Sequence, residues 1–180
     1  GSGEIRLTVA QNAILVNVAE DRLNDLMAEP LLEQFSPHPH PNMAGLVTCT
    51  GSDYCSLALI DTKSVGRWIT EELIKQYPEA PPVMMRWSGC PAGCGNHQAA
   101  DIGFQGCRTR VDDKVVDGVQ IFVGGRTGNQ VRPGVRIMDL IPVDTLEDLL
   151  PVVIKHLELL KQVQRDSRTE KLVLMVPAST

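Results

Sequence analysis

The sequence lacks several features that define common protein classes. It has no run of about 18 or more apolar residues, the length that a membrane-spanning helix needs. Its first residues, GSGEIRLT, show neither the basic nor the apolar region of a secretion signal. It has no excess of positive charge, because the formal net charge is -5 at pH 7, which argues against nucleic acid or a membrane surface as the general partner. We therefore expect a cytoplasmic protein.

A disulfide framework is also not expected. The chain has five cysteines, an odd number, and nothing in the sequence indicates export to an oxidising compartment. The thiols should stay reduced and available, so ligation of a metal or cluster is the more natural use for them.

What is present fits one compact domain with an appendage. Alternating and helical hydrophobic patterns predict two strands, then a helix over 23–35 that Pro30 interrupts. The proline-rich segment 36–42 follows as the internal boundary, because it can neither extend a helix nor join a central strand ladder. The two strands are expected over 4–9 and 13–18.

Beyond this boundary the pattern predicts a larger unit. A strand ends at Cys49, a helix with apolar residues over 65–74 stops at Pro78, and a strand ends just before Cys90. Three more strands and a last helix complete it, the helix opening at Asp144 with Glu147 in a capping-box-like start. The three strands are expected over 101–110, 115–125 and 134–143, the first two joined across 111–114.

The spacing of four cysteines suggests a common site. Cys49 and Cys55 follow one strand as C-x5-C, and Cys90 and Cys94 follow another as C-x3-C, so adjacent strands would bring both pairs to one edge of a sheet. Structural zinc sites usually take ligands two to four residues apart, whereas a 4Fe-4S cluster tolerates the longer spacer and uses backbone amides from glycine-rich loops. Spacing favours the cluster, with zinc or unrelated buried thiols as alternatives.

Three segments in order resemble a known family. They are VTCTGSDYCSLALIDTK, RWSGCPAGCGNHQAADIGFQG and VDGVQIFVGGRTG, and they are similar to the C-terminal half of the siroheme-dependent assimilatory nitrite and sulfite reductases, most of all the ferredoxin-nitrite reductases. The resemblance runs from GEIRLTVAQN to about Lys161. It implies an oxidoreductase of nitrate assimilation, in the cytoplasm or, in a photosynthetic eukaryote, the plastid stroma.

The resemblance also implies cofactors and ligands. Cys49, Cys55, Cys90 and Cys94 match the ligands of a 4Fe-4S cluster, and Cys94 matches the thiolate that also binds the iron of siroheme. Six electrons from ferredoxin or a similar donor would then convert nitrite to ammonia, or sulfite to sulfide.

The fold implied is α+β, a mixed sheet flanked by helices. Residues 1–40 would be a strand-strand-helix piece of a ferredoxin-like module, 41–162 the domain that binds siroheme and the cluster, and 163–180 a C-terminal tail. Complete enzymes of this family are about twice as long or longer, so the chain is expected to be inactive until it meets the missing N-terminal half.

Other polar residues are weaker candidates for the site. Arg126, between glycines in GGRTG, suits a siroheme carboxylate, and Asn129 and Arg132 follow it as lesser candidates. His97 could lie near the haem edge, but a histidine on a helix surface is the expected role. Cys107 matches no ligand position and is expected to be a buried small hydrophobe.

The remaining candidates are expected to have ordinary roles. His38 and His40 should lie in a solvated loop, and Arg67 and Arg86 should meet solvent or form ion pairs. The segment CTGSDYC resembles the form found in nitrite reductases more than the form common in sulfite reductases, and this resemblance favours nitrite over sulfite as substrate. A sulfite reductase fragment, or a non-enzymatic zinc or iron-sulfur electron-transfer module, remains the alternative.

Overall fold

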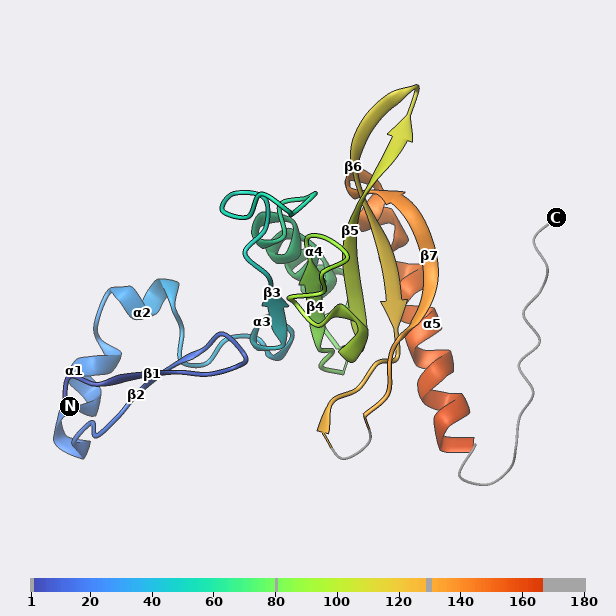
Figure 1. Cartoon of the computed structure of the whole chain (residues 1–180). Coiled ribbons are helices and arrows are strands. Elements are labelled where there is room, and N and C mark those ends of the chain that lie inside the picture. The colour runs from blue at the N-terminus through green and yellow to red at the C-terminus, as the bar shows by residue number, and fades with distance from the viewer. Residues whose placement is uncertain (1, 80, 129–130, 167–180) are drawn as a thin grey trace.

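The computed structural model describes residues 2–79, 81–128 and 131–166. Two sheets organise this part of the chain: a two-stranded hairpin, and a five-stranded sheet (Figure 1). In chain order the elements are β1 (Ile5–Leu7), β2 (Ala13–Leu15), η1 (Glu20–Arg22), α1 (Leu23–Met27), α2 (Leu31–Gln34), α3 (Pro41–Ala44), β3 (Leu46–Thr48), α4 (Lys63–Gln76), β4 (Met85–Ser88), η2 (His97–Ala99), β5 (Ile102–Val111), β6 (Lys114–Val123), β7 (Val135–Pro142), η4 (Val143–Thr145) and α5 (Leu146–Asp166).

The large sheet is mixed, as the α+β prediction requires. Its strand order is β3-β4-β5-β6-β7; β3, β4 and β5 run parallel, and β6 and β7 are added antiparallel. The predicted strands are all present, and the helix expected over 23–35 is broken around Pro30 into α1 and α2. The capping box was predicted wrongly: Asp144 lies inside the 3-10 turn η4, and α5 begins two residues later at Leu146.

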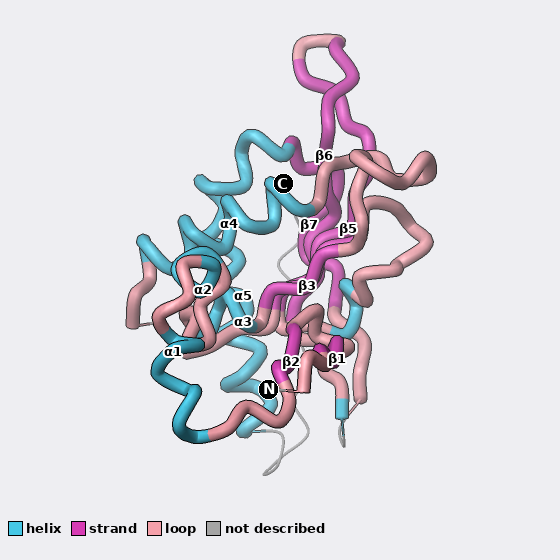
Figure 2. The backbone as a smooth tube through the Cα atoms, turned by 90° about the vertical axis from the view of Figure 1, so that its left-hand side faces the viewer, coloured by secondary structure: helices cyan, strands magenta, loops and turns pink. Residues whose placement is uncertain are grey.

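One face of the large sheet is covered by helices α4 and α5, which lie together on one side of the strands in Figure 2. The strands contribute alternate side chains to this core, as the pleat requires, and Trp87 stacks on Phe104 of the neighbouring strand with ring centroids 3.9 Å apart. The helices contribute the apolar stripes read from the sequence. The buried core residues include Ile69, Leu73, Met85, Trp87, Ile102, Phe104, Val119, Ile121, Val123, Leu150, Val153 and Leu157.

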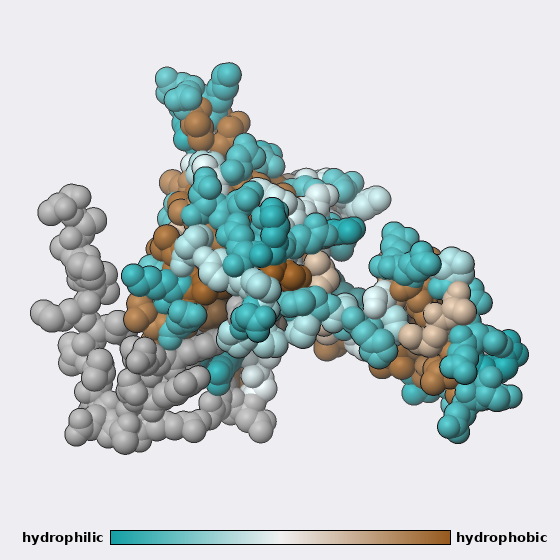
Figure 3. All heavy atoms as spheres, turned by 180° about the vertical axis from the view of Figure 1, so that it is seen from behind, coloured by the Kyte–Doolittle hydropathy of each residue, from teal (hydrophilic) through white to brown (hydrophobic). Residues whose placement is uncertain are grey.

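The N-terminal arm, defined here as residues 2–41, stands away from this core (Figure 1). No residue within it is buried, although it carries many large apolar side chains; Leu7 is 84% exposed and Phe35 is 63% exposed. Figure 3 shows these apolar groups exposed on the separate lobe at the right of the view. A two-stranded hairpin has little stability of its own, and the apolar side chains of this arm are exposed to solvent.

At the other end of the chain, the last helix runs further than the sequence predicted. Helix α5 continues to Asp166, so residues 163–166 of the predicted tail are helical, and residues 167–180 lie outside the described part. Within that part, no helix combines the length and the apolar character needed to cross a membrane.

Candidate functional site

The two cysteine loops start at the same edge of the large sheet. Strands β3 and β4 are parallel neighbours, with Thr48 opposite Trp87, and the ladder continues one step further through a 2.9 Å hydrogen bond from Cys49 N–H to the Trp87 carbonyl. Each loop therefore leaves its strand at the same level. This is the juxtaposition that the spacing of the cysteines predicted.

Gly89, which precedes Cys90, links the two loops directly. Its N–H donates to Cys49 Sγ over 3.1 Å, and its carbonyl accepts from Leu59 N–H over 2.7 Å. Thr62 supports the first cysteine from the other side, because its Oγ1 donates to the Cys49 carbonyl at 2.8 Å. The sulfur of Cys49 thus already has a backbone amide as its hydrogen-bond partner, the kind of partner that iron-bound sulfurs use.

The other cysteines lie on the turns of these loops. Cys55 N–H donates to the Gly51 carbonyl at 3.0 Å, and both Gly51 and Gly93 have positive φ angles, +78° and +74°, which glycine adopts without strain. Cys94 is exposed, whereas the other cysteines, Cys49, Cys55, Cys90 and Cys107, are of intermediate burial. All five are free thiols.

The thiols are not arranged as a closed site for a single ion. Among the described residues, no three His, Cys, Asp or Glu side chains are grouped so that they could hold one metal ion. A mononuclear zinc site needs four ligand atoms at about 2.0–2.3 Å from one centre.

A buried polar pair lies at the base of the second loop, and one member was placed wrongly by sequence. His97 is not on a helix surface. It is the first residue of η2, it is only 3% exposed, and its Nδ1 lies 2.9 Å from Ser88 Oγ. Ser88 Oγ also accepts from Gly95 N–H at 3.1 Å. Burial lowers the pKa of His97, and the nearby Gln105 side chain opposes this shift.

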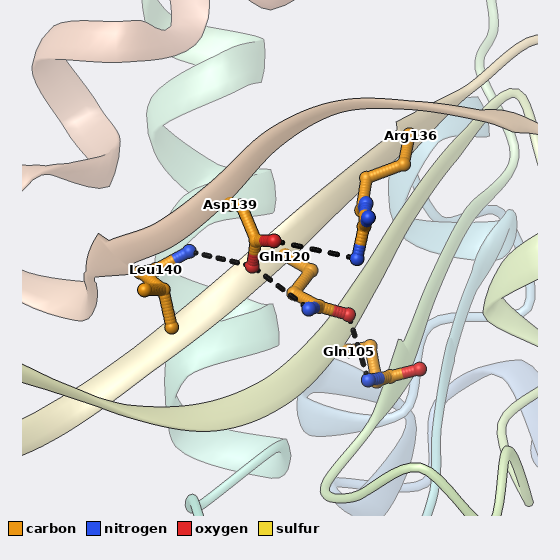
Figure 4. A network of polar contacts seen from close by, with 5 residues as sticks. All are labelled: Gln105, Gln120, Arg136, Asp139 and Leu140. Atoms are coloured by element: carbon orange, nitrogen blue, oxygen red, sulfur yellow. Dashed lines mark hydrogen bonds and ion pairs between the residues drawn. The ribbon is translucent and has the colours of Figure 1, made fainter.

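The sheet face opposite α4 and α5 is polar. Figure 4 shows a chain of contacts across three strands, in which Gln105 Nε2 donates to Gln120 Oε1 and Gln120 Nε2 donates to Asp139 Oδ1, each at 2.8 Å. Arg136 Nη1 lies 3.3 Å from the other oxygen of Asp139. The alternating pleat gives Arg86 to this face as well, and its Nε is buried without a hydrogen-bond partner, so the predicted solvent or ion-pair role does not describe that atom.

The arginines of the GGRTG loop lie close together. Arg126 is exposed, and its backbone pairs with that of Arg132 through hydrogen bonds of 2.9 and 3.2 Å. Arg132 Nε donates to the Gly124 carbonyl at 2.7 Å. Burial and the charge of Arg126 lower the pKa of Arg132, and Asp101 opposes them. Asn129, the other candidate on this loop, lies outside the described residues.

This arginine loop borders the segment that follows Cys94. Gly134 N–H donates to the Gln98 carbonyl at 2.7 Å, and Gly124 N–H donates to the Asp101 carbonyl at 2.9 Å. Two positive side chains are therefore carried on a loop that is bonded to the residues just beyond the second cysteine loop.

The remaining candidates have structural roles. Cys107 is half-buried, not fully buried as expected; burial and then the charge of Asp139 raise the pKa of its thiol, which keeps it protonated. His38 and His40 are exposed as predicted, and Arg67 forms the expected surface ion pair, with Glu71 at 2.7 Å.

Sequence reasoning missed Ser88 altogether. A lone serine between a tryptophan and a glycine gives no signal by itself, and only the register of β4 turns its hydroxyl toward Gly95 and His97. The buried state of His97 likewise depends on contacts between segments that the sequence does not reveal.

Comparison with known proteins identifies relatives for most of the chain. The family described as "Nitrite and sulphite reductase 4Fe-4S domain" matches residues 40–175. The chain is 45% identical over 150 residues to a ferredoxin-nitrite reductase of Synechococcus elongatus, and 46% identical over 155 residues to a chloroplastic ferredoxin-nitrite reductase of Spinacia oleracea. These alignments cover 83% and 85% of this chain but only 29% and 26% of the relatives.

A solved structure shows the same fold. The Mycobacterium tuberculosis NirA protein superposes with a TM-score of 0.77 over 89% of this chain and 32% of that chain, at 24% sequence identity. The chain thus spans between a quarter and a third of the length of the proteins that it matches.

Proposed function

The chain belongs to the nitrite and sulphite reductase 4Fe-4S domain family, and from this premise we propose that it is the cofactor-binding part of a ferredoxin-nitrite reductase. The observation that carries the proposal is the meeting of two cysteine loops at one sheet edge, where Gly89 of the second loop is hydrogen-bonded to Cys49 and Leu59 of the first. The identity of about 45% to ferredoxin-nitrite reductases supports nitrite as the substrate and ferredoxin as the electron donor.

Four cysteines would hold the cluster. Cys49, Cys55 and Cys90 are half-buried and Cys94 is exposed, which fits three thiolates that serve the cluster alone and one that siroheme also reaches. A 4Fe-4S cluster supplies single electrons, and siroheme supplies the iron at which nitrite is reduced to ammonia. The chain's own part is to hold the thiolates in place, to donate backbone amides to sulfur, and to leave one thiol open toward the second cofactor.

Positive side chains near the site would bind the siroheme carboxylates. Arg126 is exposed on a loop bonded to the segment after Cys94, and a guanidinium pairs with a carboxylate through two parallel hydrogen bonds. Arg132 adds charge beside it, and we assign Asn129 to the same group from its position in the loop sequence. Arg86 offers a buried unpaired Nε on the polar sheet face.

The N-terminal arm would pack against the rest of the enzyme. Its exposed apolar side chains support a partner of matching apolar character, and the part of the relatives that this chain does not span is the natural source. We propose the division into an N-terminal segment over 1–40, a cofactor-binding domain over 41–162 and a C-terminal tail over 163–180. Because most siroheme-binding cations would come from the other part, the 180 residues alone should not reduce nitrite.

The test is ammonia production from nitrite with dithionite and a viologen as the electron source. We expect no turnover by the chain alone, and turnover when it is joined to the remaining part of the enzyme. In the joined enzyme Cys94→Ser should abolish turnover and Cys107→Ser should leave it intact. Robust turnover by the 180 residues alone, or by the joined Cys94→Ser enzyme, would overturn the proposal; sulfite reduction at a higher rate than nitrite reduction would change the substrate assignment.

A further inference from the structure

One serine hydroxyl closes the base of the loop that carries Cys90 and Cys94. Ser88 lies before the loop and is 1% exposed; its Oγ accepts from Gly95 N–H at 3.1 Å and lies 2.9 Å from His97 Nδ1. Two residues that follow Cys94 are therefore tied to a buried oxygen atom of a residue that precedes Cys90.

The histidine in this contact is closely packed. Its ring packs against Phe122 with centroids 4.9 Å apart, and its backbone lies so close to β5 that a Cβ on Gly103 would be 1.8 Å from the His97 carbonyl oxygen. Phe122 therefore packs on the ring and β5 confines the backbone, and together they hold Nδ1 beside the serine hydroxyl.

The pair is maintained at an energetic cost. His97 Nε2 is buried and meets no full hydrogen-bond partner in the described part of the chain. The Gln105 side chain, which raises the pKa of His97, satisfies the ring only in part, and an incompletely satisfied buried polar atom lowers stability. A phenylalanine would fill a similar space without that cost. The polar atom that a phenylalanine cannot supply is Nδ1, which is the atom in contact with Ser88.

We propose that Ser88 and His97 form a clamp that sets the position of the Cys94 thiol relative to Cys90. The inference rests on the proposed role of Cys94 as the thiolate shared by the two cofactors. Both residues are positioning residues, since they act through the loop and touch no reacting atom. The loop between them contains three glycines, Gly89, Gly93 and Gly95, so without the clamp its backbone has more conformational freedom.

The first arm of the test measures the clamp without any cofactor. Hydrogen exchange of the Gly95 amide is followed in the 180-residue chain by NMR or by mass spectrometry of a peptide over 89–97. Ser88→Ala should speed exchange by about five-fold, the loss expected when one hydrogen bond is removed. His97→Phe should speed it at least about two-fold, whereas His97→Asn, which keeps a polar atom at the position of Nδ1, should stay close to wild type.

A matched histidine control is available on α5. His156 is exposed and its Nδ1 contacts only the Val152 carbonyl of its own helix, at 2.8 Å, so His156→Asn should leave exchange of Gly95 unchanged. Unchanged exchange in both Ser88→Ala and His97→Phe would overturn the clamp.

The second arm asks whether the clamp tunes the cofactors. In the complete enzyme, Ser88→Ala and His97→Phe should shift the visible spectrum of siroheme and the EPR signal of the reduced cluster, and His97→Asn should restore both. Faster Gly95 exchange with wild-type spectra would overturn the positioning role. If the wild-type enzyme carries neither cofactor, the proposed function fails, but the exchange result still decides whether the clamp exists.

Discussion

Replacing Gly95 by alanine should damage the cysteine site, because an added methyl group there meets a strand backbone. A Cβ at this position would lie 2.0 Å from the Trp87 carbonyl oxygen and 2.6 Å from its carbonyl carbon. Real Cβ atoms do not approach closer than 3.0 Å, so one of the two backbones must move by about 1 Å (3.0 − 2.0). The obstacle is the backbone of β4, which is held in the sheet by β3 and β5.

The cost follows from this rigidity. Overpacking typically costs 1–3 kcal/mol, and because the neighbour is a strand backbone we expect about 3 kcal/mol, which corresponds to a fall in melting temperature of about 6–12 °C for a chain of this size. The displaced loop should also lose the Gly95 bond to Ser88 and bind iron poorly.

Gly128 provides the matched control. It has a φ of +84° and nothing within 4 Å of an added Cβ, so Gly128→Ala meets only the conformational cost of about 1 kcal/mol and should retain iron as the wild type does. Urea unfolding and iron content after anaerobic reconstitution measure both effects. Equal stability and equal iron content in the two variants would refute the steric reasoning.

Three further predictions concern the surroundings of the site. The Gln11 side chain donates to the Thr48 carbonyl at 2.6 Å and accepts from Thr48 N–H at 3.2 Å, at the end of β3. Gln11→Ala should therefore speed proteolysis of the N-terminal arm by about ten-fold, whereas Asn12→Ala should not. Equal proteolysis rates in the two variants would refute this contact as the anchor of the arm. Burial raises the pKa of Asp61, but hydrogen bonds from the first turn of α4 outweigh it and hold this pKa below its ordinary 3.8. The carboxylate therefore stabilises the fold above pH 3.8, and this stabilisation is lost as the pH falls through the lowered pKa. Asp61→Ala should cost about 1 kcal/mol of stability at pH 7, and a stability deficit that persists in strong acid would contradict the assignment. Arg126→Gln should reduce siroheme content of the complete enzyme several-fold and Arg67→Gln should not, as its absorption spectrum would report; equal content would remove Arg126 from the cofactor site.

Local pattern was sufficient for most of the secondary structure and for placing the two cysteine loops at one edge of the sheet. Strands 101–110 and 115–125 alternate clearly and are joined by a short polar turn, and the structure pairs them as β5 and β6. The two cysteine pairs follow strands that are neighbours, because a helix between two strands usually returns the chain to an adjacent parallel position.

The burial of side chains that contact distant segments could not be predicted from local pattern. His97 follows a glycine-rich loop where a surface location is the ordinary expectation, and only its packing on Gly103 and Phe122 buries it. Arg86 lies between Met85 and Trp87, whose side chains face the helices, so its burial depends on what covers the opposite face of the sheet. Asp144 has the right spacing for a cap, but the 3-10 turn η4 moves the start of the helix past it.

The central claim is that four cysteines hold one iron-sulfur cluster, and its most direct test is iron and acid-labile sulfide per chain after anaerobic reconstitution. We predict about four iron atoms and four sulfides in the wild type and in Cys107→Ser, with a reduced-cluster EPR signal in both. The serine variants of Cys49, Cys55, Cys90 and Cys94 should each lose the cluster. Stoichiometric zinc in place of iron, or an equal loss of iron from Cys107→Ser, would contradict the claim.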